Sequence, residues 1–197
     1  MSRELFPLFV DLTGRRCVVI GAGPIGEGKI EGLLHCGARI TVIAPHVTAK
    51  IQAWATASQL TLQRREFIPA DLDSAFLTVA ATSSPDTNHA IAAEARRRGV
   101  LCNVVDDPDY CDFFYPAVVR RGALQIAVST SGTSPALARN LREKLEAQFG
   151  PEYEAWLEEV EKRRRDILAT VTDPDQRRAQ VEALVAEESF REFRDRR

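Results

Sequence analysis

The sequence predicts an α/β fold in which a parallel sheet is followed by a strand-helix region and a small C-terminal helical domain. Short β-rich runs alternate with helical patterns over the first half, which is typical of a parallel sheet covered on both faces. A glycine-rich turn joins the first run to a helical stretch, as in Rossmann-like folds. After Gly150 the sequence is densely charged, and two helices are expected at about residues 152–171 and 175–193. We expect three domains, at residues 1–112, 113–150 and 151–197.

Five runs are expected to form the sheet, at residues 15–20, 39–44, 60–67, 75–81 and 100–106. The third run alternates apolar and polar residues, which predicts an edge strand. The others are nearly continuous apolar runs, as expected for strands buried on both faces, so the last two are predicted to be central. Helices are expected at about residues 24–36, closed by Gly37, and at about residues 86–98.

The pattern changes at residues 113–132, where two strand-like runs surround the turn Arg120-Arg121-Gly122. We expect this excursion to form an arm that makes a dimer. Thr133-Ser134-Pro135 then predicts the start of a helix, because a hydroxyl caps the first turn and proline fits its first position. Four-residue spacing gives that helix one apolar face, made of Leu137, Leu141, Leu145 and Phe149.

Composition argues against several classes of protein. The 26 Lys and Arg against 28 Asp and Glu give a net charge of -2, which is not the basic field of a nucleic-acid-binding protein. The four cysteines form no CxxC pair, which favours free thiols in a reducing compartment, and the three histidines lack metal-ligand spacing. The segment MSRELFPLFVDL is expected to be neither a signal peptide nor a membrane span. We therefore expect a cytoplasmic protein without a metal site and without a nucleic-acid or membrane partner.

The turn Gly21-Ala22-Gly23-Pro24-Ile25-Gly26 is the strongest local signal. It follows an expected strand and opens an expected helix, which is the context of a dinucleotide-binding turn. Gly21 permits a tight turn, Gly23 lets a pyrophosphate approach the backbone, and Gly26 allows close packing of helix on strand. Free N–H groups at the helix start bind phosphates, and Pro24 stands where a missing N–H costs little. A glycine turn without a ligand is the alternative.

The second expected strand ends in Ala44-Pro45-His46, where dinucleotide-binding folds place an acidic residue on the adenosine ribose. No carboxylate stands there, and no Arg or Lys follows at once to hold a 2′-phosphate. Charge therefore leaves the choice between NAD and NADP open. His46 fits either cofactor, and it equally fits a surface loop.

Asp106 lies at the carboxyl end of the fifth expected strand, in the segment CNVVDD. Open α/β sheets bind their ligands at that edge. A carboxylate there, beside the apolar residues 113–115, is a candidate general base or acid. The alternative is a loop aspartate that forms a turn with Asp107 and Pro108.

A hydroxyl-rich loop leads into the helix that starts at Pro135. N–H groups and hydroxyls at a helix start bind carboxylates or phosphates. One hydroxyl suffices for a cap, so five hydroxyls around a glycine indicate an anion site, with a solvated loop as the alternative. The loop consists of Ser129, Thr130, Ser131, Gly132, Thr133 and Ser134.

Together these segments resemble precorrin-2 dehydrogenase, the NAD-dependent module that also begins trifunctional siroheme synthase. The likeness runs from Leu5 to about Phe149 and is carried by LFPLFVDLTGRRCVVIGAGPIGEGK, ITVIAP, AATSSPDTN, CNVVDDPDYCDFFYPA and IAVSTSGTSPALARNLREKLE. The helices after Gly150 are similar to the variable helical domain of this family. No chain remains for the methyltransferase module of the trifunctional enzyme, so we expect another protein to perform that step.

The resemblance implies that NAD oxidises precorrin-2 to sirohydrochlorin, with a hydride passing from the tetrapyrrole to the nicotinamide. It places the important aspartate of the family on Asp106, as a general base. Some members also insert ferrous iron, which is then a second substrate. The family lacks the ribose carboxylate too, so the gap after the second strand favours NAD. The expected cofactor contacts are Gly21, Gly23, Pro24, Ile25, Gly26, Pro45, His46 and Thr82.

The implied substrate is rich in carboxylates, so residues 129–134 and the nearby Arg120, Arg121 and Arg139 become its expected anchors. Members of the family pair through the region after the main sheet, which predicts a homodimer with a substrate cleft shared between subunits. A noncatalytic redox sensor that binds NAD(H) is the alternative that the glycine turn by itself allows.

Overall fold

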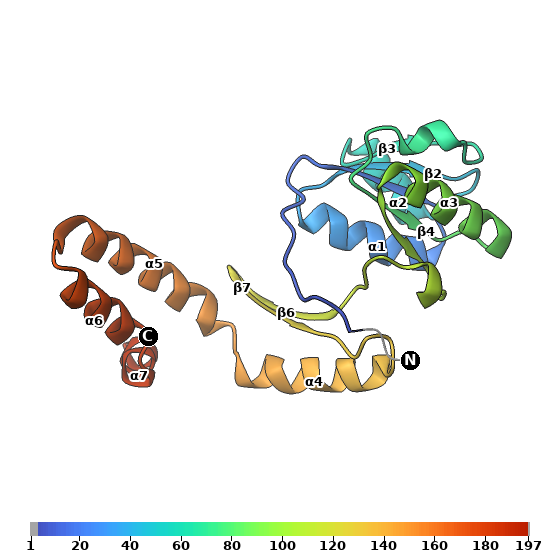
Figure 1. Cartoon of the computed structure of the whole chain (residues 1–197). Helices are drawn as coiled ribbons and strands as arrows, with labels where there is room; N and C mark the ends of the chain where they lie inside the picture. Colours follow the sequence, from blue (N-terminus) through green and yellow to red (C-terminus); the bar gives the residue numbers. More distant parts are fainter. Residues whose placement is uncertain (1–3, 197) are drawn as a thin grey trace. The chain divides into compact units, whose positions relative to one another are not determined.

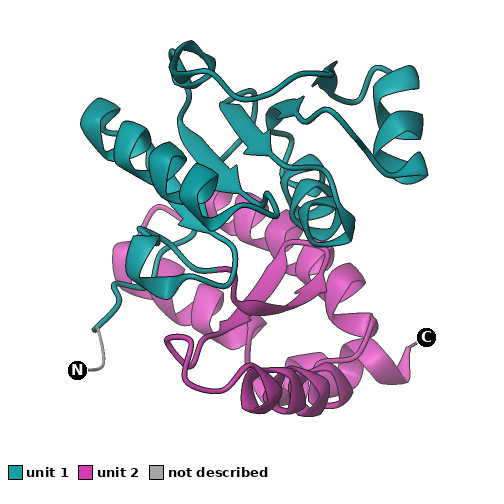
Figure 2. Cartoon of the chain, turned by 90° about the vertical axis from the view of Figure 1, so that its right-hand side faces the viewer, with its two compact units in different colours: residues 1–114 teal, residues 115–197 magenta. Residues whose placement is uncertain are grey.

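The computed structural model describes residues 4–196, which form two compact units that divide between Phe114 and Tyr115 (Figure 2). Residues 1–3, where the predicted domain 1–112 and the N-terminal segment begin, lie outside the described residues, as does residue 197. The hairpin region and the C-terminal helices belong to one unit, and their separation into two domains stays a prediction.

The first unit contains a five-stranded parallel sheet in the order β3-β2-β1-β4-β5 (Figure 1). Its strands are β1 (Arg16–Ile20), β2 (Arg39–Ile43), β3 (Thr61–Gln63), β4 (Leu77–Ala80) and β5 (Leu101–Val104). The helices are α1 (Pro24–His35), α2 (Ala49–Thr56), α3 (Pro85–Arg98) and the 3-10 turns η1 (Pro69–Leu72) and η2 (Pro108–Tyr110). The strand order reverses at β1, so the carboxyl ends of β1 and β4 form a topological switch point. The predicted Rossmann-like α/β fold is confirmed.

The sheet is buried on both faces, which explains the continuous apolar runs. Val18 and Ile20 of β1 pack in one cluster with Ile91 and Ala95 of α3. Val19 points to the opposite face, and its side chain is also fully buried. Burial of each such side chain contributes roughly 1.5–3 kcal/mol, so the two covered faces together hold β1 in the centre.

The predicted central place of the last strand is wrong, because β5 lies at an edge of the sheet. Its outward backbone groups are covered by the chain that follows. The N–H of Cys102 donates to the Asp112 carboxylate (3.0 Å), and the carbonyl of Cys102 accepts from the N–H of Asp112 (2.8 Å). Cys111 Sγ accepts from the N–H of Val104 (3.3 Å) and donates to its carbonyl (3.1 Å). The apolar run correctly indicates burial, but a loop supplies the cover instead of a sixth strand.

The other edge strand, β3, is shorter than predicted and occupies the predicted edge position. It ends at Gln63 because the chain then turns toward η1. There the Arg65 guanidinium binds both carboxylate oxygens of the buried Asp71. The expected residues 64–67 therefore lie outside the sheet, and Arg65 among them forms this ion pair.

The second unit begins with an antiparallel hairpin of β6 (Ala117–Arg121) and β7 (Leu124–Val128), which confirms the predicted strand pair. Gly122 stands in the turn with a φ of +55°. The helices α4 (Pro135–Gln148) and α5 (Glu152–Thr170) contact the hairpin. As predicted, α4 begins with Pro135, and the hydroxyl of Ser134 accepts the N–H of Leu137 (3.2 Å).

The predicted single helix at residues 175–193 is wrong, because the chain forms α6 (Pro174–Leu184) and α7 (Glu187–Asp195). Ala186 between them is extended, with φ -63° and ψ 150°. This change of direction lets Phe190 pack on Tyr153 and Trp156 of α5, with ring centroids 4.5 and 4.9 Å apart. Aromatic packing therefore decides the break, and neither glycine nor proline marks it in the sequence.

Candidate active site

The glycine turn lies at the carboxyl end of β1, where packing dictates two of its glycines. Gly21 has a φ of +97°, and a Cβ on it would lie 2.2 Å from the carbonyl oxygen of Ala81. A Cβ on Gly26 would lie 2.7 Å from the carbonyl oxygen of Gly21, so α1 can approach the turn closely. Neither position accepts a side chain without a shift of backbone.

Gly23 differs from both, because a Cβ there would meet no atom within 4 Å. It is the exposed N-cap of α1, and no side chain caps this helix. Pro24 follows at the first helical position, and the first-turn N–H groups of Ile25 and Gly26 have no acceptor in their own helix. Open space beside free donors fits the pyrophosphate of a dinucleotide.

The loop after β2 is fastened to this turn. The N–H of Gly21 donates to the carbonyl of Ile43 (3.0 Å), and the N–H of Thr48 donates to the carbonyl of Ala22 (3.2 Å). Pro45 and His46, the predicted adenosine-side contacts, are exposed in that loop. The structure thus brings them beside the glycine turn.

A pocket of about 240 Å³ lies at the carboxyl ends of β4 and β5. It brings together Thr82 and Asp106, two predicted site residues from different loops. The glycine turn adjoins it, because a Cβ on Gly21 would lie 2.7 Å from the backbone nitrogen of Thr82. The other residues that line it are Ser83, Pro85, Asn88, His89, Val104, Val105 and Asp107.

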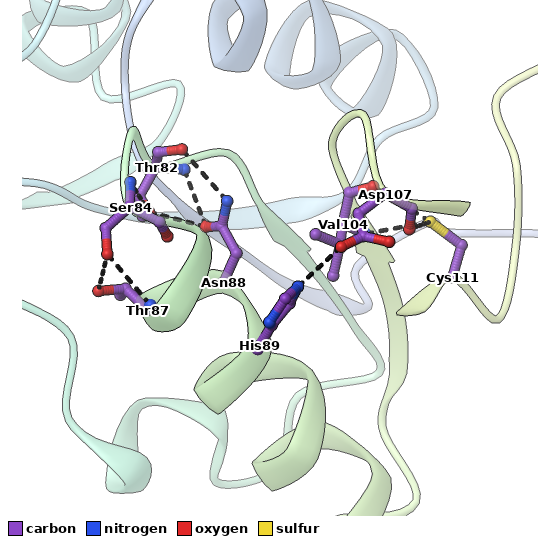
Figure 3. Close-up of polar contacts among 8 residues, drawn as sticks. All are labelled: Thr82, Ser84, Thr87, Asn88, His89, Val104, Asp107 and Cys111. Carbon is purple, nitrogen blue, oxygen red and sulfur yellow. Dashed lines mark hydrogen bonds and ion pairs between the residues drawn. The ribbon is translucent and has the colours of Figure 1, made fainter. Parts of the chain in front are cut away.

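Asn88, which sequence reasoning missed, holds the loop after β4 (Figure 3). Its side chain is buried, and its Oδ1 accepts from the N–H (3.1 Å) and the hydroxyl (2.7 Å) of Thr82. Its Nδ2 donates to the carbonyl of Thr82 (3.2 Å). Ser84 caps α3 by accepting the N–H of Thr87 (3.2 Å). The Ser84-Pro85 helix start was a signal that the sequence offered for this arrangement.

His89 and Asp107 were missed as site residues as well. Nε2 of His89 lies 2.7 Å from Oδ2 of Asp107 (Figure 3). The imidazole also stacks on Tyr110, with ring centroids 4.0 Å apart and an angle of 14° between the ring planes. The two residues come from α3 and from the loop after β5, so no local pattern connects them.

Lys29 adds a cation near the pocket. Burial lowers the pKa of its amine below the ordinary value, while the negative charge of Asp106 opposes that change. The side chain projects from the second turn of α1, and it is half-buried. One ammonium group in the first unit therefore interacts electrostatically with the predicted general base.

The predicted substrate loop belongs to the second unit, whereas Asp106 belongs to the first. Thr130 and Ser134 bind each other: the Thr130 hydroxyl donates to the Ser134 carbonyl (3.1 Å) and accepts its N–H (3.1 Å). Ser131 and Gly132 take the left-handed conformation, with φ of +51° and +81°. The exposed residues with hydroxyls in this loop are Ser129, Ser131 and Thr133.

The three predicted arginine anchors differ in their surroundings. Arg120 and Arg139 are exposed on β6 and α4. The guanidinium of Arg121 donates to the carbonyls of Phe149 (2.8 Å) and Glu146 (3.1 Å), and so it closes the end of α4. Arg121 thus has a structural contact that the sequence did not indicate.

The described part of the chain, residues 4–196, contains no group of three or more His, Cys, Asp or Glu side chains that could hold a metal ion. Over the same residues, no helix combines the length and apolar character that crossing a membrane requires.

The family described as putative NAD(P)-binding matches residues 8–117, which is more than half of the sequence. The chain belongs to this family. A second family, described as sirohaem biosynthesis protein central, matches residues 121–148 of this NAD(P)-binding chain.

Siroheme synthases are among its relatives. Siroheme synthase 2 of Klebsiella pneumoniae subsp. pneumoniae is 44% identical over 141 residues, which cover 72% of this chain and 31% of that protein. Siroheme synthase 1 of Aeromonas hydrophila subsp. hydrophila is 35% identical over 185 residues, which cover 94% of this chain and 40% of the relative. The NAD(P)-binding chain therefore spans well under half the length of these relatives.

A solved structure matches nearly the whole chain. It is SirC, a precorrin-2 dehydrogenase, with a TM-score of 0.81, 27% identity and 98% of both chains covered. With the family matches, this similarity confirms the predicted resemblance to the precorrin-2 dehydrogenase module of siroheme synthases.

Proposed function

We propose that this chain is an oxidoreductase that converts precorrin-2 to sirohydrochlorin with NAD. The pocket at the ends of β4 and β5 carries the proposal, because it joins Asp106 to a loop that adjoins the glycine turn. Membership in the NAD(P)-binding family and similarity to a precorrin-2 dehydrogenase support it.

The reaction removes a hydride and a proton from the macrocycle. When bound, NAD supplies the hydride acceptor. The chain itself binds the cofactor phosphates at the first-turn N–H groups of Ile25 and Gly26. The carboxylate of Asp106 takes the proton as general base, a role that typically contributes about 10²–10⁴ in rate.

NAD is the proposed form of the cofactor. Neither Pro45 nor His46 offers the permanent cation that a 2′-phosphate prefers. Lys50, in the first turn of α2, already binds Glu31 (3.1 Å) and lies 3.7 Å from Glu27. Fluorescence titrations with NADH and NADPH test this choice, and tighter binding of NADPH would overturn it.

The substrate carboxylates are proposed to bind Arg120, Arg139 and the exposed hydroxyls of residues 129–133, in a homodimer that shares the cleft. The exposure of these groups supports the assignment. Arg139→Ala is expected to raise KM for precorrin-2, and analytical ultracentrifugation should report two chains. An active monomer would contradict the proposed homodimer. An unchanged KM in Arg139→Ala would contradict the proposed binding of a substrate carboxylate by Arg139. A cytoplasmic location, proposed on the cysteine pattern, completes the assignment.

An anaerobic assay tests the reaction. Purified chain receives enzymatically made precorrin-2 and NAD, and sirohydrochlorin absorbance is followed. Asp106→Asn is the informative variant, because asparagine also tolerates the left-handed backbone of Asp106 and removes only the charge. We expect turnover to fall about a thousandfold with the dissociation constant for NADH nearly unchanged.

Ferrous iron is then added to the same reaction. If iron enters sirohydrochlorin faster than in a protein-free control, ferrous iron is a second substrate of this chain. If neither NAD nor NADP supports sirohydrochlorin formation while NADH still binds, the enzyme assignment fails and a noncatalytic redox sensor takes its place.

A further inference from the structure

Helix α3 holds both sides of the pocket (Figure 3). Asn88 binds Thr82 at the end of β4, and the next residue, His89, binds Asp107 beyond the end of β5. The first contact joins positions six residues apart, whereas the second joins positions 18 residues apart. The second contact ends one residue after Asp106, the proposed general base.

The backbone of Asp106 explains why such a contact matters. Its φ is +60°, in the left-handed region where the Cβ of residues other than glycine crowds the following carbonyl oxygen. Aspartate tolerates this region better than most residues. Such a conformation persists where the surrounding structure fixes it, so the direction of the carboxylate depends on the residues on either side.

The residues on either side of Asp106, Val105 and Asp107, are both held in place by hydrogen bonds. The N–H of Val105 donates to the carbonyl of Ala80 (3.0 Å), which attaches the turn to β4. The carbonyl of Asp107 accepts the N–H of Tyr110 (3.2 Å), which fixes the loop to η2. The carboxylate of Asp107 reaches α3, with Oδ2 2.7 Å from Nε2 of His89. Because a carboxylate only accepts, the imidazole donates from Nε2.

We propose that His89 is a positioning residue for Asp106, acting through Asp107 to fix the left-handed turn that presents the Asp106 carboxylate to the pocket. The inference rests on the proposed function, in which that carboxylate takes the proton. A displacement of about 1 Å in a reacting group lowers the rate by up to about a hundredfold. The backbone bonds of the loop remain when His89 is replaced, so we expect a loss of about tenfold.

The imidazole makes two contacts that substitution can separate. His89→Phe keeps an aromatic ring for the stack on Tyr110 and removes the donor to Asp107. His89→Gln places an amide donor close to the Nε2 position and removes the ring. Positioning through the hydrogen bond therefore predicts retained turnover in His89→Gln and reduced turnover in His89→Phe, whereas packing alone predicts the reverse.

The experiment measures kcat, KM for precorrin-2 and NADH affinity in the full chain. We expect kcat to fall about tenfold in His89→Phe and in Asp107→Ala, with NADH affinity nearly unchanged, and no further loss in the double variant. His35→Ala is the control, because His35 is exposed in the last turn of α1 and should leave kcat unaltered. A larger loss in His89→Gln than in His89→Phe overturns the proposal.

Amide hydrogen exchange across residues 104–110 adds a readout that needs no activity. His89→Phe should speed exchange there several-fold, while His89→Gln and His35→Ala should not. If the wild-type chain does not oxidise precorrin-2, the proposed function fails, and this exchange pattern still decides whether His89 fixes the turn. Unchanged kcat in His89→Phe overturns the proposal for an active enzyme, and unchanged exchange overturns it for an inactive one.

Discussion

Two of the loops that lead from a strand into a helix with proline as its first residue treat the helix start in opposite ways. Between β1 and α1 the N-cap is Gly23, and no side chain caps the helix. Between β7 and α4 the N-cap is Ser134, whose hydroxyl accepts the N–H of Leu137, while Thr130 holds Ser134 in turn. The first loop leaves its backbone donors without a side-chain acceptor, and the hydroxyls of the second loop bind its own backbone.

The difference teaches how to interpret hydroxyls in a sequence. Glycine at an N-cap costs a helix only a few tenths of a kcal/mol relative to serine, so a bare start is a cheap way to keep an anion site open. Serine and threonine often bond their own backbone, as Thr130 and Ser134 do. A count of hydroxyls therefore overestimates the groups that remain for a ligand.

The largest expected effect separates the glycines of the two loops. Gly21→Ala places a Cβ 2.2 Å from a backbone oxygen at a φ of +97°, so we expect a loss of stability of about 3 kcal/mol or more. Gly132→Ala has a φ of +81° but meets no atom within 4 Å, so the loss should be roughly 1–2 kcal/mol. Urea unfolding measures both. Equal losses would show that the Ala81 contact relaxes freely.

The next effect tests whether the first loop is open for a ligand. Gly23→Ala has room in the chain itself, but its Cβ occupies the space proposed for the pyrophosphate. We expect NADH affinity to fall about tenfold to a hundredfold, equal to about 1.4–2.8 kcal/mol, with little change in unfolding. Gly28→Ala, also in open space on α1, is the matched control and should bind normally. Full affinity in Gly23→Ala rules out phosphate binding at this turn.

A smaller effect tests the cap of the second loop. Ser134→Ala removes the bond to the N–H of Leu137 and should cost about 1 kcal/mol of stability. Ser131→Ala changes an exposed side chain and should stay within about 0.5 kcal/mol of wild type, while it raises KM for precorrin-2 under the proposed function. The comparison fails if Ser134→Ala unfolds at the same urea concentration as Ser131→Ala.

The smallest effect uses thiols to monitor one unit separately. All four cysteines lie in the first unit. Burial raises the pKa of Cys17 to about 11 and that of Cys102 to about 12, so at pH 8 the folded chain holds almost no reactive thiolate at either position. Iodoacetamide labelling followed by mass spectrometry should be slow at both, faster in Gly21→Ala, and unchanged in Ser134→Ala. Acceleration in Ser134→Ala would show that the two units unfold together.

Local sequence patterns were enough to predict much of the first unit, because the features that form it lie within short segments of the chain. Continuous apolar runs predicted buried strands, and Gly21 and Gly26 stand where backbone atoms approach within side-chain distance. The break between α6 and α7 was not predictable in this way, because Phe190 packs on residues of α5. The helix α2 was missed although Thr48 caps it, since eight residues show little apolar periodicity.

In the candidate site, too, local features could be predicted and contacts between distant positions could not. The position of Asp106 at the carboxyl edge of the sheet could be predicted because strand ends are visible in the sequence, whereas its catalytic role stays a proposal. The contacts around the pocket could not be predicted from local sequence. His89 meets Asp107 across 18 positions, and the buried amide of Asn88 binds Thr82. The hydroxyl loop was recognised as a loop, but its internal bonds depend on the left-handed backbone of Ser131 and Gly132.

The cover on β5 limits how copies of this sheet can associate. An open edge strand offers unpaired N–H and C=O groups, which recruit strands from other chains and promote aggregation. On β5 the outward groups of Cys102 and Val104 already bind Asp112 and Cys111. Strand addition at that edge must first displace residues 111–112, so this short segment acts as a barrier to growth of the sheet.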